Sequence, residues 1–226
     1  MNAASMNAAP MSQDPSPTPG AAPQSAATRR AVLATRNPHK IVELRAILAA
    51  AGAEVELLGV DRFPDLPDVV ESGLTFAENA LLKARDAAAR TALPALADDS
   101  GFCVAAMNGM PGVFSARWAG RHGDDAANLD LLLAQLGDVP DEHRAAHFTC
   151  AAALVLPDGT EVVREGVIEG RLIRAPRGAN GFGYDPVFVP DGHELTTAEM
   201  EPAAKNAISH RTLAFRALAR DLAELL

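Results

Sequence analysis

Positive charge and aromatic side chains are both scarce in this sequence. It holds 20 Lys and Arg against 29 Asp and Glu, for a formal net charge of −9, and only 4% of its residues are aromatic. Proteins that bind DNA or RNA contact many phosphates through Lys and Arg. This acidic chain is therefore not expected to bind a polynucleotide, and any phosphate that it binds must meet a local group of cations.

Cysteines and long apolar runs are also few. Cys103 and Cys150 lie far apart without CxxC spacing, each beside apolar residues, so we expect two buried thiols instead of zinc ligands or a disulfide. No apolar run approaches the length of a membrane span, and the first residues lack the charged start and apolar stretch of a secretory signal. The sequence predicts a cytoplasmic protein without a membrane-spanning segment.

The beginning of the chain differs in composition from the rest. Residues 1–28 are rich in Ala, Ser, Pro, Gln and Asn and show no apolar period, which predicts a disordered extension. With 48% hydrophobic residues overall, the remaining chain, residues 29–226, can bury one sizeable aliphatic core. We expect a single domain there, of a size that allows two lobes.

Helix and strand patterns alternate early in the chain and give way to a hairpin later. Asp99-Ser100-Gly101 predicts a tight turn between two strands in the segment 94–107. The order of elements indicates an α/β or α+β fold with a mixed sheet. The other expected elements are helices over 38–51, 75–90, 124–136 and 209–226, and strands over 31–35, 54–58, 148–156 and 161–168.

Two of the predicted helices begin with cations, although a helix N-terminus carries about half a positive charge and favours Asp or Glu. Lys40 lies in the first turn after the predicted N-cap Asn37, and His210 and Arg211 follow Ser209, the predicted N-cap of the last helix. Free N–H groups, the helix dipole and a cation together favour a bound phosphate. For either start alone, a side chain that points to solvent at small cost is the favoured interpretation, but two such starts in one chain favour phosphate binding.

Two neighbouring carboxylates, Asp98 and Asp99, interrupt an apolar segment. Side chains adjacent in an extended chain face opposite sides, so one can enter a site while the other anchors its surroundings; a plain turn explains them equally well. Hydrolysis of a triphosphate needs a hard cation, and Mg²⁺ takes one or two carboxylates plus phosphate oxygens and water. Asp99 and Glu71 are the candidate ligands, because Glu78 matches a capping box with Thr75.

A glycine-rich segment surrounds one of the few aromatic residues. Gly178, Gly181 and Gly183 flank Phe182. Such a backbone can pass close to a flat ligand and expose the ring for stacking on a base, which contributes roughly 1–3 kcal/mol. A flexible loop with a core-facing Phe182 is the alternative, and it is less favoured in a chain so poor in aromatics.

Six motifs follow one another along the chain: Thr35-Arg36-Asn37-Pro38-His39-Lys40 and the segments 71–80, 97–101, 111–117, 181–186 and 209–211. Together they resemble the Ham1/RdgB family of inosine-triphosphate pyrophosphatases. Any one motif alone would be a weak indication, but six in the right order are highly specific. The resemblance covers essentially everything after residue 29.

The resemblance implies a two-lobed α/β protein around a long mixed sheet, usually a homodimer, with the nucleotide in the cleft between the lobes. It implies hydrolysis of non-canonical purine nucleoside triphosphates (ITP, dITP and XTP) to the monophosphate and pyrophosphate, which keeps them out of DNA and RNA. Asp99 would be the catalytic base and would contact Mg²⁺. The implied substrate contacts are Thr35, Arg36, Asn37, Pro38, His39 and Lys40 at the phosphates, Ser100, and Phe182, Gly183, Tyr184, Asp185, Lys205, His210 and Arg211 around the base, sugar and remaining phosphate.

One position departs from the common form of the first motif, which has Gly where Arg36 stands. A side chain there needs room and affects the backbone path, or it adds a phosphate contact. Two other functions stay open: a Maf-like pyrophosphatase with another base preference, and a nucleotide-binding regulator without catalysis. The preference among ITP, dITP and XTP also stays open.

Overall fold

The computed structural model describes residues 1, 29–36, 38–52 and 54–226, without the side chains at positions 38 and 39. Residues 2–28 of the predicted extension and the predicted N-cap Asn37 lie outside the described residues. The helices and strands are β1 (Arg30–Leu33), α1 (Pro38–Ala50), β2 (Glu56–Gly59), α2 (Phe76–Thr91), β3 (Ala95–Val104), β4 (Met110–Pro111), α3 (Asp125–Gln135), β5 (Ala145–Val155), β6 (Glu161–Leu172), β7 (Phe188–Pro190), α4 (Pro202–Ile208) and α5 (His210–Leu225), with 3₁₀ turns η1 (Val60–Arg62), η2 (Ala105–Met107), η3 (Gly112–Arg117), η4 (Asp141–His143) and η5 (Asp185–Val187).

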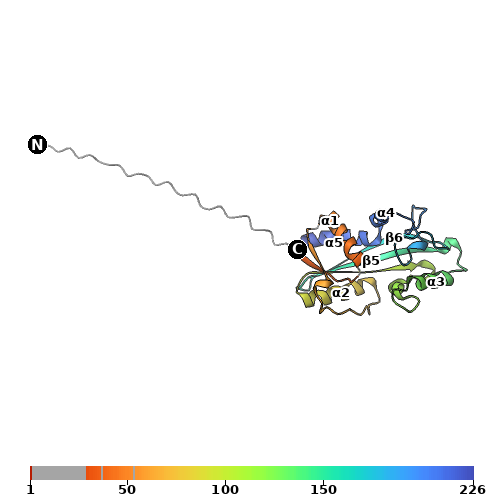
Figure 1. The fold of residues 1–226 in the computed structure, drawn as a ribbon, viewed down its shortest axis with the longest axis horizontal. Coiled ribbons are helices and arrows are strands. Elements are labelled where there is room, and N and C mark those ends of the chain that lie inside the picture. The colour runs from red at the N-terminus through yellow and green to blue at the C-terminus, as the bar shows by residue number, and fades with distance from the viewer. Residues whose placement is uncertain (2–28, 37, 53) are drawn as a thin grey trace.

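One mixed sheet forms the centre of the fold. Its strands lie in the order β2-β1-β3-β5-β6-β7, and β4 pairs with β3. β1 is parallel to β2 and β3, whereas the pairs from β3 through β5 and β6 to β7 are antiparallel. Helices α1 and α5 cover one face and α2 covers the other (Figure 1). The predicted α/β fold around a long mixed sheet is confirmed.

Three apolar clusters fill the protein. Two of them lie on opposite faces of one end of the sheet and form one lobe, and the third lies at the other end and forms the second lobe. The first joins α1 and α5 to the sheet through residues such as Leu44 and Phe215. The second packs the small Ala side chains of α2 closely against the opposite face. The third lies at the far end of the sheet, where Leu132 of α3 meets Phe102 and Phe188. Both lobes therefore share the long strands β3, β5 and β6.

The predicted turn at Asp99-Ser100-Gly101 is wrong. β3 is a continuous strand of 10 residues, paired with β5 along its whole length. Gly101 is required for another reason, because a Cβ there would lie 2.4 Å from Gly112 O and 2.7 Å from the ring of Phe76. Pairing and close packing across the sheet thus outweigh the local turn preference of Asp, Ser and Gly.

Most other predicted boundaries are confirmed. Thr75, Asp124 and Ser209 cap their helices, each accepting a hydrogen bond from a first-turn N–H group, and Thr75 forms the predicted capping box with Glu78. Both cysteines are buried and free, as expected. Three short elements were not predicted, α4, β4 and β7, which have only 7, 2 and 3 residues and show no clear period. Within the described residues, no helix is long and apolar enough to cross a membrane.

Gly166 lets α5 lie directly against β6. A Cβ at this position would lie 2.2 Å from His210 O and 2.5 Å from Ala214 N, both backbone atoms. We expect Gly166→Ala to lower the free energy of unfolding by about 1–3 kcal/mol, because the helix must move away. Denaturant unfolding measures this loss. Gly137→Ala is the matched control, since its Cβ would meet only Ala134 O at 3.4 Å, and an equal loss in both variants would contradict the prediction.

Candidate functional site

One large cavity, of about 840 Å³, collects the predicted site residues. Its wall is formed by the segment after β1, the middle of β3, the loop before η5 and the start of α5. Asn37 and the side chains of Pro38 and His39 lie outside the described part of the chain. The predicted residues that line the cavity are Thr35, Arg36, Lys40, Glu71, Asp99, Ser100, Phe182, Gly183, Tyr184, Asp185, Lys205, His210 and Arg211.

Asp98 is buried at this cavity and holds the cations of both helix starts. Its Oδ2 accepts hydrogen bonds from Lys40 Nζ at 2.8 Å and from Arg211 Nε at 3.4 Å. Burial by itself raises the pKa of Asp98, but Lys40, Arg211 and Lys83 outweigh it and hold the pKa well below its ordinary value. Arg211 also donates to Glu43 at 2.7 Å, which ties α5 to α1. The two predicted phosphate-binding helix starts therefore belong to one site.

The start of α5 also places a neutral imidazole at the cavity. His210 stacks on Phe148 with ring centroids 5.0 Å apart and an interplanar angle of 12°. Burial, together with the charges of Arg211 and Lys205, lowers the pKa of His210 well below its ordinary value. The ring is therefore uncharged near pH 7, and it can donate one hydrogen bond and accept another.

Asp99 faces the other side of β3, toward α2. Its Oδ2 accepts a hydrogen bond from Asn79 Nδ2 at 3.1 Å, and Lys83 Nζ lies 3.8 Å from its Oδ1. Lys83 in turn pairs with Glu71 at 2.7 Å. Burial raises the pKa of Asp99 and the charge of Glu71 adds to the rise, although Lys83 and Asn79 oppose it. Asp99 is thus a stronger base than an ordinary aspartate.

The loop before η5 presents one aromatic ring. Phe182 is 56% exposed, and Lys205 Nζ lies 5.6 Å from the centre of its ring. The buried Asp185 accepts hydrogen bonds from Phe182 N at 2.8 Å and from Lys205 Nζ. Tyr184 is buried too, and its hydroxyl donates to Ser115 O at 2.9 Å. These contacts hold Phe182 at the cavity, so the alternative of a core-facing ring is wrong.

Arg36, the residue that departs from the common motif, has partners within the protein. It pairs with Asp68 and donates from Nη2 to Leu66 O at 2.6 Å. The side chains of Arg36 and Asp68 are 55% and 84% exposed, so their pair contributes little to stability. It does connect the segment after β1 to the segment that leads to Glu71.

Comparison with known proteins identifies the relatives of this chain. The model of the Ham1 family matches residues 31–221. The chain belongs to the Ham1 family. Over 197 residues it is 64% identical to a protein of Streptomyces coelicolor and 63% identical to one of Streptomyces avermitilis, both named dITP/XTP pyrophosphatase. Each alignment covers 87% of this chain and 98% of the relative.

Solved Ham1 structures have the same fold. A HAM1 protein from Coxiella burnetii matches with a TM-score of 0.80 and 44% identity, over 87% of this chain and 99% of that one. The nucleoside-triphosphatase / dITP/XTP pyrophosphatase of Mycobacterium abscessus matches with a TM-score of 0.72 and 52% identity, over 87% and 100%. The mixed sheet and its two lobes are therefore those of the Ham1 proteins.

Two residues of this Ham1 site were missed in the sequence. Asn79 and Lys83 are four residues apart on α2, a spacing that places both on the helix face turned toward Asp99. Burial lowers the pKa of Lys83, but Asp99, Asp98 and Glu71 reverse this and raise it, so the ammonium group stays charged. The spacing of two polar residues on an Ala-rich helix was the available signal.

The carboxylates at the Ham1 cavity outnumber its Lys and Arg side chains. Among the described lining residues, eight are Asp or Glu and six are Lys or Arg. A polyanion that enters needs a further cation, and Asp99 and Glu71 offer the one or two carboxylates that Mg²⁺ takes from a protein. In the described part of the chain, no group of three or more His, Cys, Asp or Glu is arranged to hold a metal. The residues fit a metal whose other ligands are substrate oxygens and water.

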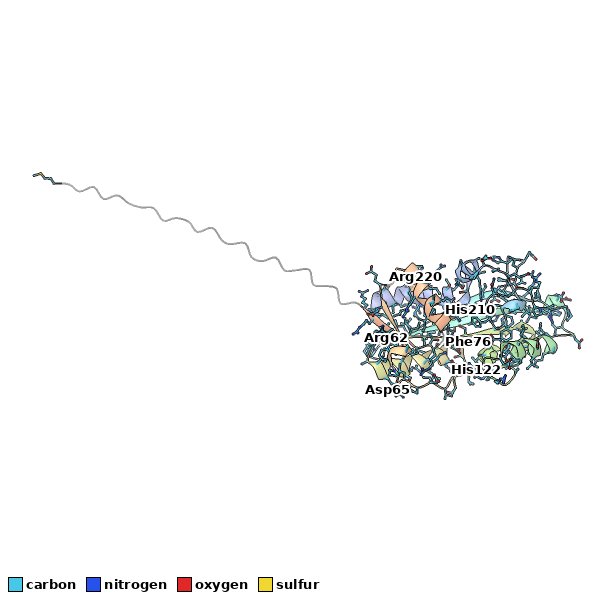
Figure 2. All side chains as sticks on the ribbon, viewed as in Figure 1. Arg62, Asp65, Phe76, His122, His210 and Arg220 are labelled. Carbon is cyan, nitrogen blue, oxygen red and sulfur yellow. The ribbon has the colours of Figure 1, made fainter. Side chains whose placement is uncertain are left out.

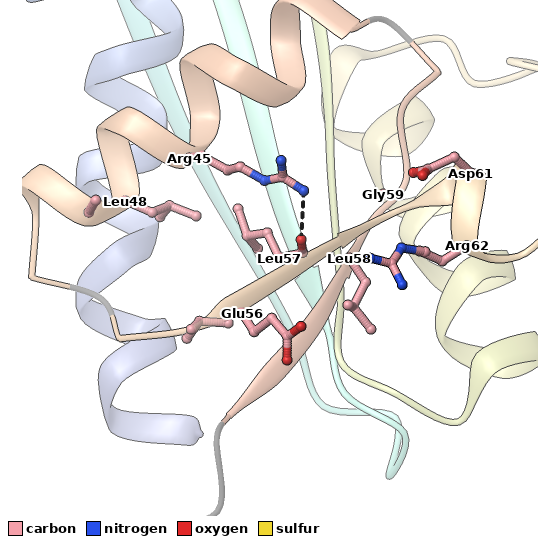
Figure 3. A pocket seen from close by; sticks show the side chains of 10 residues that line it. Arg45, Leu48, Glu56, Leu57, Leu58, Gly59, Asp61 and Arg62 are labelled. Atoms are coloured by element: carbon pink, nitrogen blue, oxygen red, sulfur yellow. Dashed lines mark hydrogen bonds between the residues drawn. The ribbon is translucent and has the colours of Figure 1, made fainter.

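A second cavity, of about 480 Å³, lies at the edge strand β2 beneath α1 (Figure 3). Arg45 of α1 donates to Leu57 O at 3.0 Å, which covers one edge carbonyl of β2. Its described lining includes none of the predicted site residues. Among the described residues, the predicted site residues therefore lie at the larger cavity and not at this one.

Proposed function

We propose that this chain hydrolyses the non-canonical purine nucleoside triphosphates ITP, dITP and XTP to the monophosphate and pyrophosphate, which keeps them out of DNA and RNA. The observation that carries the proposal is the identity of 53–64% with relatives named dITP/XTP pyrophosphatase, over nearly their whole length. The cavity supports it independently. A carboxylate with a raised pKa, Asp99, lies beside the cation Lys83 in a cavity that also exposes the ring of Phe182.

In this proposal Asp99 takes a proton from the water molecule that attacks the α-phosphorus. The water oxygen stays on the monophosphate, and the bond from the α-phosphorus to the bridging oxygen breaks as pyrophosphate leaves. Lys40 and Lys83 neutralise the charge that develops on the leaving group. Mg²⁺, which Asp99 and Glu71 would hold, supplies further neutralisation of the phosphate oxygens when bound. No covalent bond to the enzyme is required.

The remaining site residues are proposed to bind or position the substrate. Asp185 and Arg211 are buried and already paired, so we expect them to hold the neighbouring contacts in place. Phe182 is exposed and free to stack on the base. The other proposed contacts are Thr35, Arg36, Asn37, Pro38, His39 and Lys40 at the phosphates, Ser100, and Gly183, Tyr184, Lys205 and His210 around the base and sugar.

The base should be selected by hydrogen-bond donors directed at the purine 6-oxo group. Adenine has a 6-amino group at this position, so the donors of the protein would face another donor instead of an acceptor. A buried polar group without a partner costs about 1–3 kcal/mol, which disfavours ATP by roughly 5- to 150-fold.

We also propose that the protein acts in the cytoplasm as a homodimer. Its substrates are free nucleotides in this proposal, because its net charge of −9 disfavours binding of polynucleotides.

Release of pyrophosphate from ITP, XTP, GTP, ATP and UTP, each with Mg²⁺ and with excess chelator, tests the function. We expect ITP and XTP to be the preferred substrates, and turnover to be lost with the chelator. GTP shares the 6-oxo group and adds a 2-amino group, so the ratio of ITP to GTP shows whether position 2 is read. The proposed specificity would be overturned if ATP or UTP were turned over as fast as ITP.

A further inference from the structure

Arg117 is the least engaged cation at the large cavity. The other described Lys and Arg residues of its wall have ion pairs of 2.8 Å or shorter, whereas Arg117 Nη1 lies 4.0 Å from Glu71 Oε2. That distance is too long for a hydrogen bond, and the side chain donates no other to the residues that the structure describes. Its guanidinium donors are therefore available to a ligand in the cavity.

The guanidinium group is nevertheless held in position. Its central carbon lies 5.2 Å from the centre of the Phe114 ring, a cation–π contact. Both residues belong to η3, which the buried Ser115 fixes to β3: its hydroxyl accepts from Phe102 N at 2.8 Å and donates to Gly112 O at 2.6 Å. Arg117 thus reaches the cavity from a short turn anchored next to the strand that carries Asp99.

A row of charged side chains leads from the reacting region to Arg117. Asp99 lies 3.8 Å from Lys83, Lys83 lies 2.7 Å from Glu71, and Glu71 lies 4.0 Å from Arg117. Under the proposed function the α-phosphorus lies beside Asp99, and the base stacks on Phe182. The cations along the row then face the rest of the phosphate chain. A guanidinium group suits that place, because it can bind two phosphate oxygens at once.

We propose that Arg117 binds the pyrophosphate part of the substrate and makes the cavity selective for triphosphates over monophosphates. The inference rests on the proposed function and extends it to a residue outside the predicted site. Glu71 has a second role in this account: it balances the charges of Lys83 and Arg117 until a polyanion replaces it.

Calorimetric titration of the two products separates this role from contact with the rest of the nucleotide. Inorganic pyrophosphate and IMP are each titrated, with Mg²⁺, into the full-length wild type, Arg117→Ala and Arg117→Lys. We expect Arg117→Ala to weaken pyrophosphate binding by about 10- to 100-fold and to change IMP binding less than about 2-fold. Arg117→Lys should weaken pyrophosphate binding by an intermediate factor, because lysine keeps the positive charge but lacks the paired guanidinium donors that bind two oxygens at once.

Arg121→Ala is the matched control, because its side chain is 81% exposed and pairs with Asp124 alone among the described acids. Thermal unfolding of each variant checks that the fold is kept. Unchanged pyrophosphate binding in Arg117→Ala, or an equal loss for IMP, would overturn the inference. If the wild type fails to hydrolyse ITP, the proposed function fails instead, so the two failures are distinguishable.

Discussion

Asp99→Asn should lower the turnover of ITP by about 10²- to 10⁴-fold while nucleotide binding stays nearly unchanged. The amide has almost the same shape and can still accept the hydrogen bond from Asn79, but it cannot take a proton from water. Pyrophosphate release and equilibrium binding of ITP are both measured. Asp65→Asn is the control: this carboxylate is exposed at the edge of the molecule, away from His210 (Figure 2).

The pH profile adds a second readout for Asp99. A general base works only when deprotonated, so activity falls as the pH drops through its pKa. Burial and the charge of Glu71 raise that pKa in the metal-free protein, whereas a bound cation lowers it, so the acid limb of the wild type should move to lower pH as the Mg²⁺ concentration is raised. The residual activity of Asp99→Asn should lack this limb. Unchanged turnover in the variant would refute the assignment of Asp99 as the base, whereas nucleotide binding without any turnover by the wild type would favour the non-catalytic regulator.

Asp98→Asn should destabilise the protein by about 3–5 kcal/mol, a large loss for a domain. The carboxylate is buried and accepts hydrogen bonds from Lys40 and Arg211, and its neutral replacement leaves Glu43 as the charged partner of Arg211 among the described residues. We expect the lower end of the range, because Glu43 stays. Urea unfolding measures the loss, and Asp130→Asn on the exposed face of α3 is the control.

Acid unfolding tests the same carboxylate through its pKa. Lys40, Arg211 and Lys83 hold the pKa of folded Asp98 below that of the unfolded chain, despite the opposing effect of burial. Its contribution to stability is therefore complete above the ordinary aspartate value of about 4 and is lost as the pH falls below it. Asp98→Asn should show a weaker dependence in this range. An identical acid limb in both proteins would contradict the role given to Asp98.

The fold could be predicted where local patterns and packing agree. Thr75 and Ser209 begin helices because a capping side chain precedes an apolar stripe, and the sequence shows both features. The turn predicted at Asp99-Ser100-Gly101 is wrong because the preference of these residues for a turn is a purely local signal. Continuous pairing with β5 and the close approach of Gly112 O to Gly101 come from distant residues, and these decided the structure.

The candidate site was predictable residue by residue, but not in its connections. The motifs named Asp99, Lys40 and Arg211, which all line one cavity. Their arrangement on the two faces of β3 depends on tertiary contacts, so the sequence could not show that Asp98 joins Lys40 to Arg211. The same holds for Lys83, which meets Asp99 only because α2 packs on that face of the sheet.

The position of bound nucleotide tests the central claim most directly. Crystals of Asp99→Asn grown with ITP and Mg²⁺ should retain uncleaved substrate, with its α-phosphorus beside residue 99 and its base against Phe182. A triphosphate lying elsewhere, for example in the cavity at β2, or an α-phosphorus out of reach of residue 99, would contradict the account.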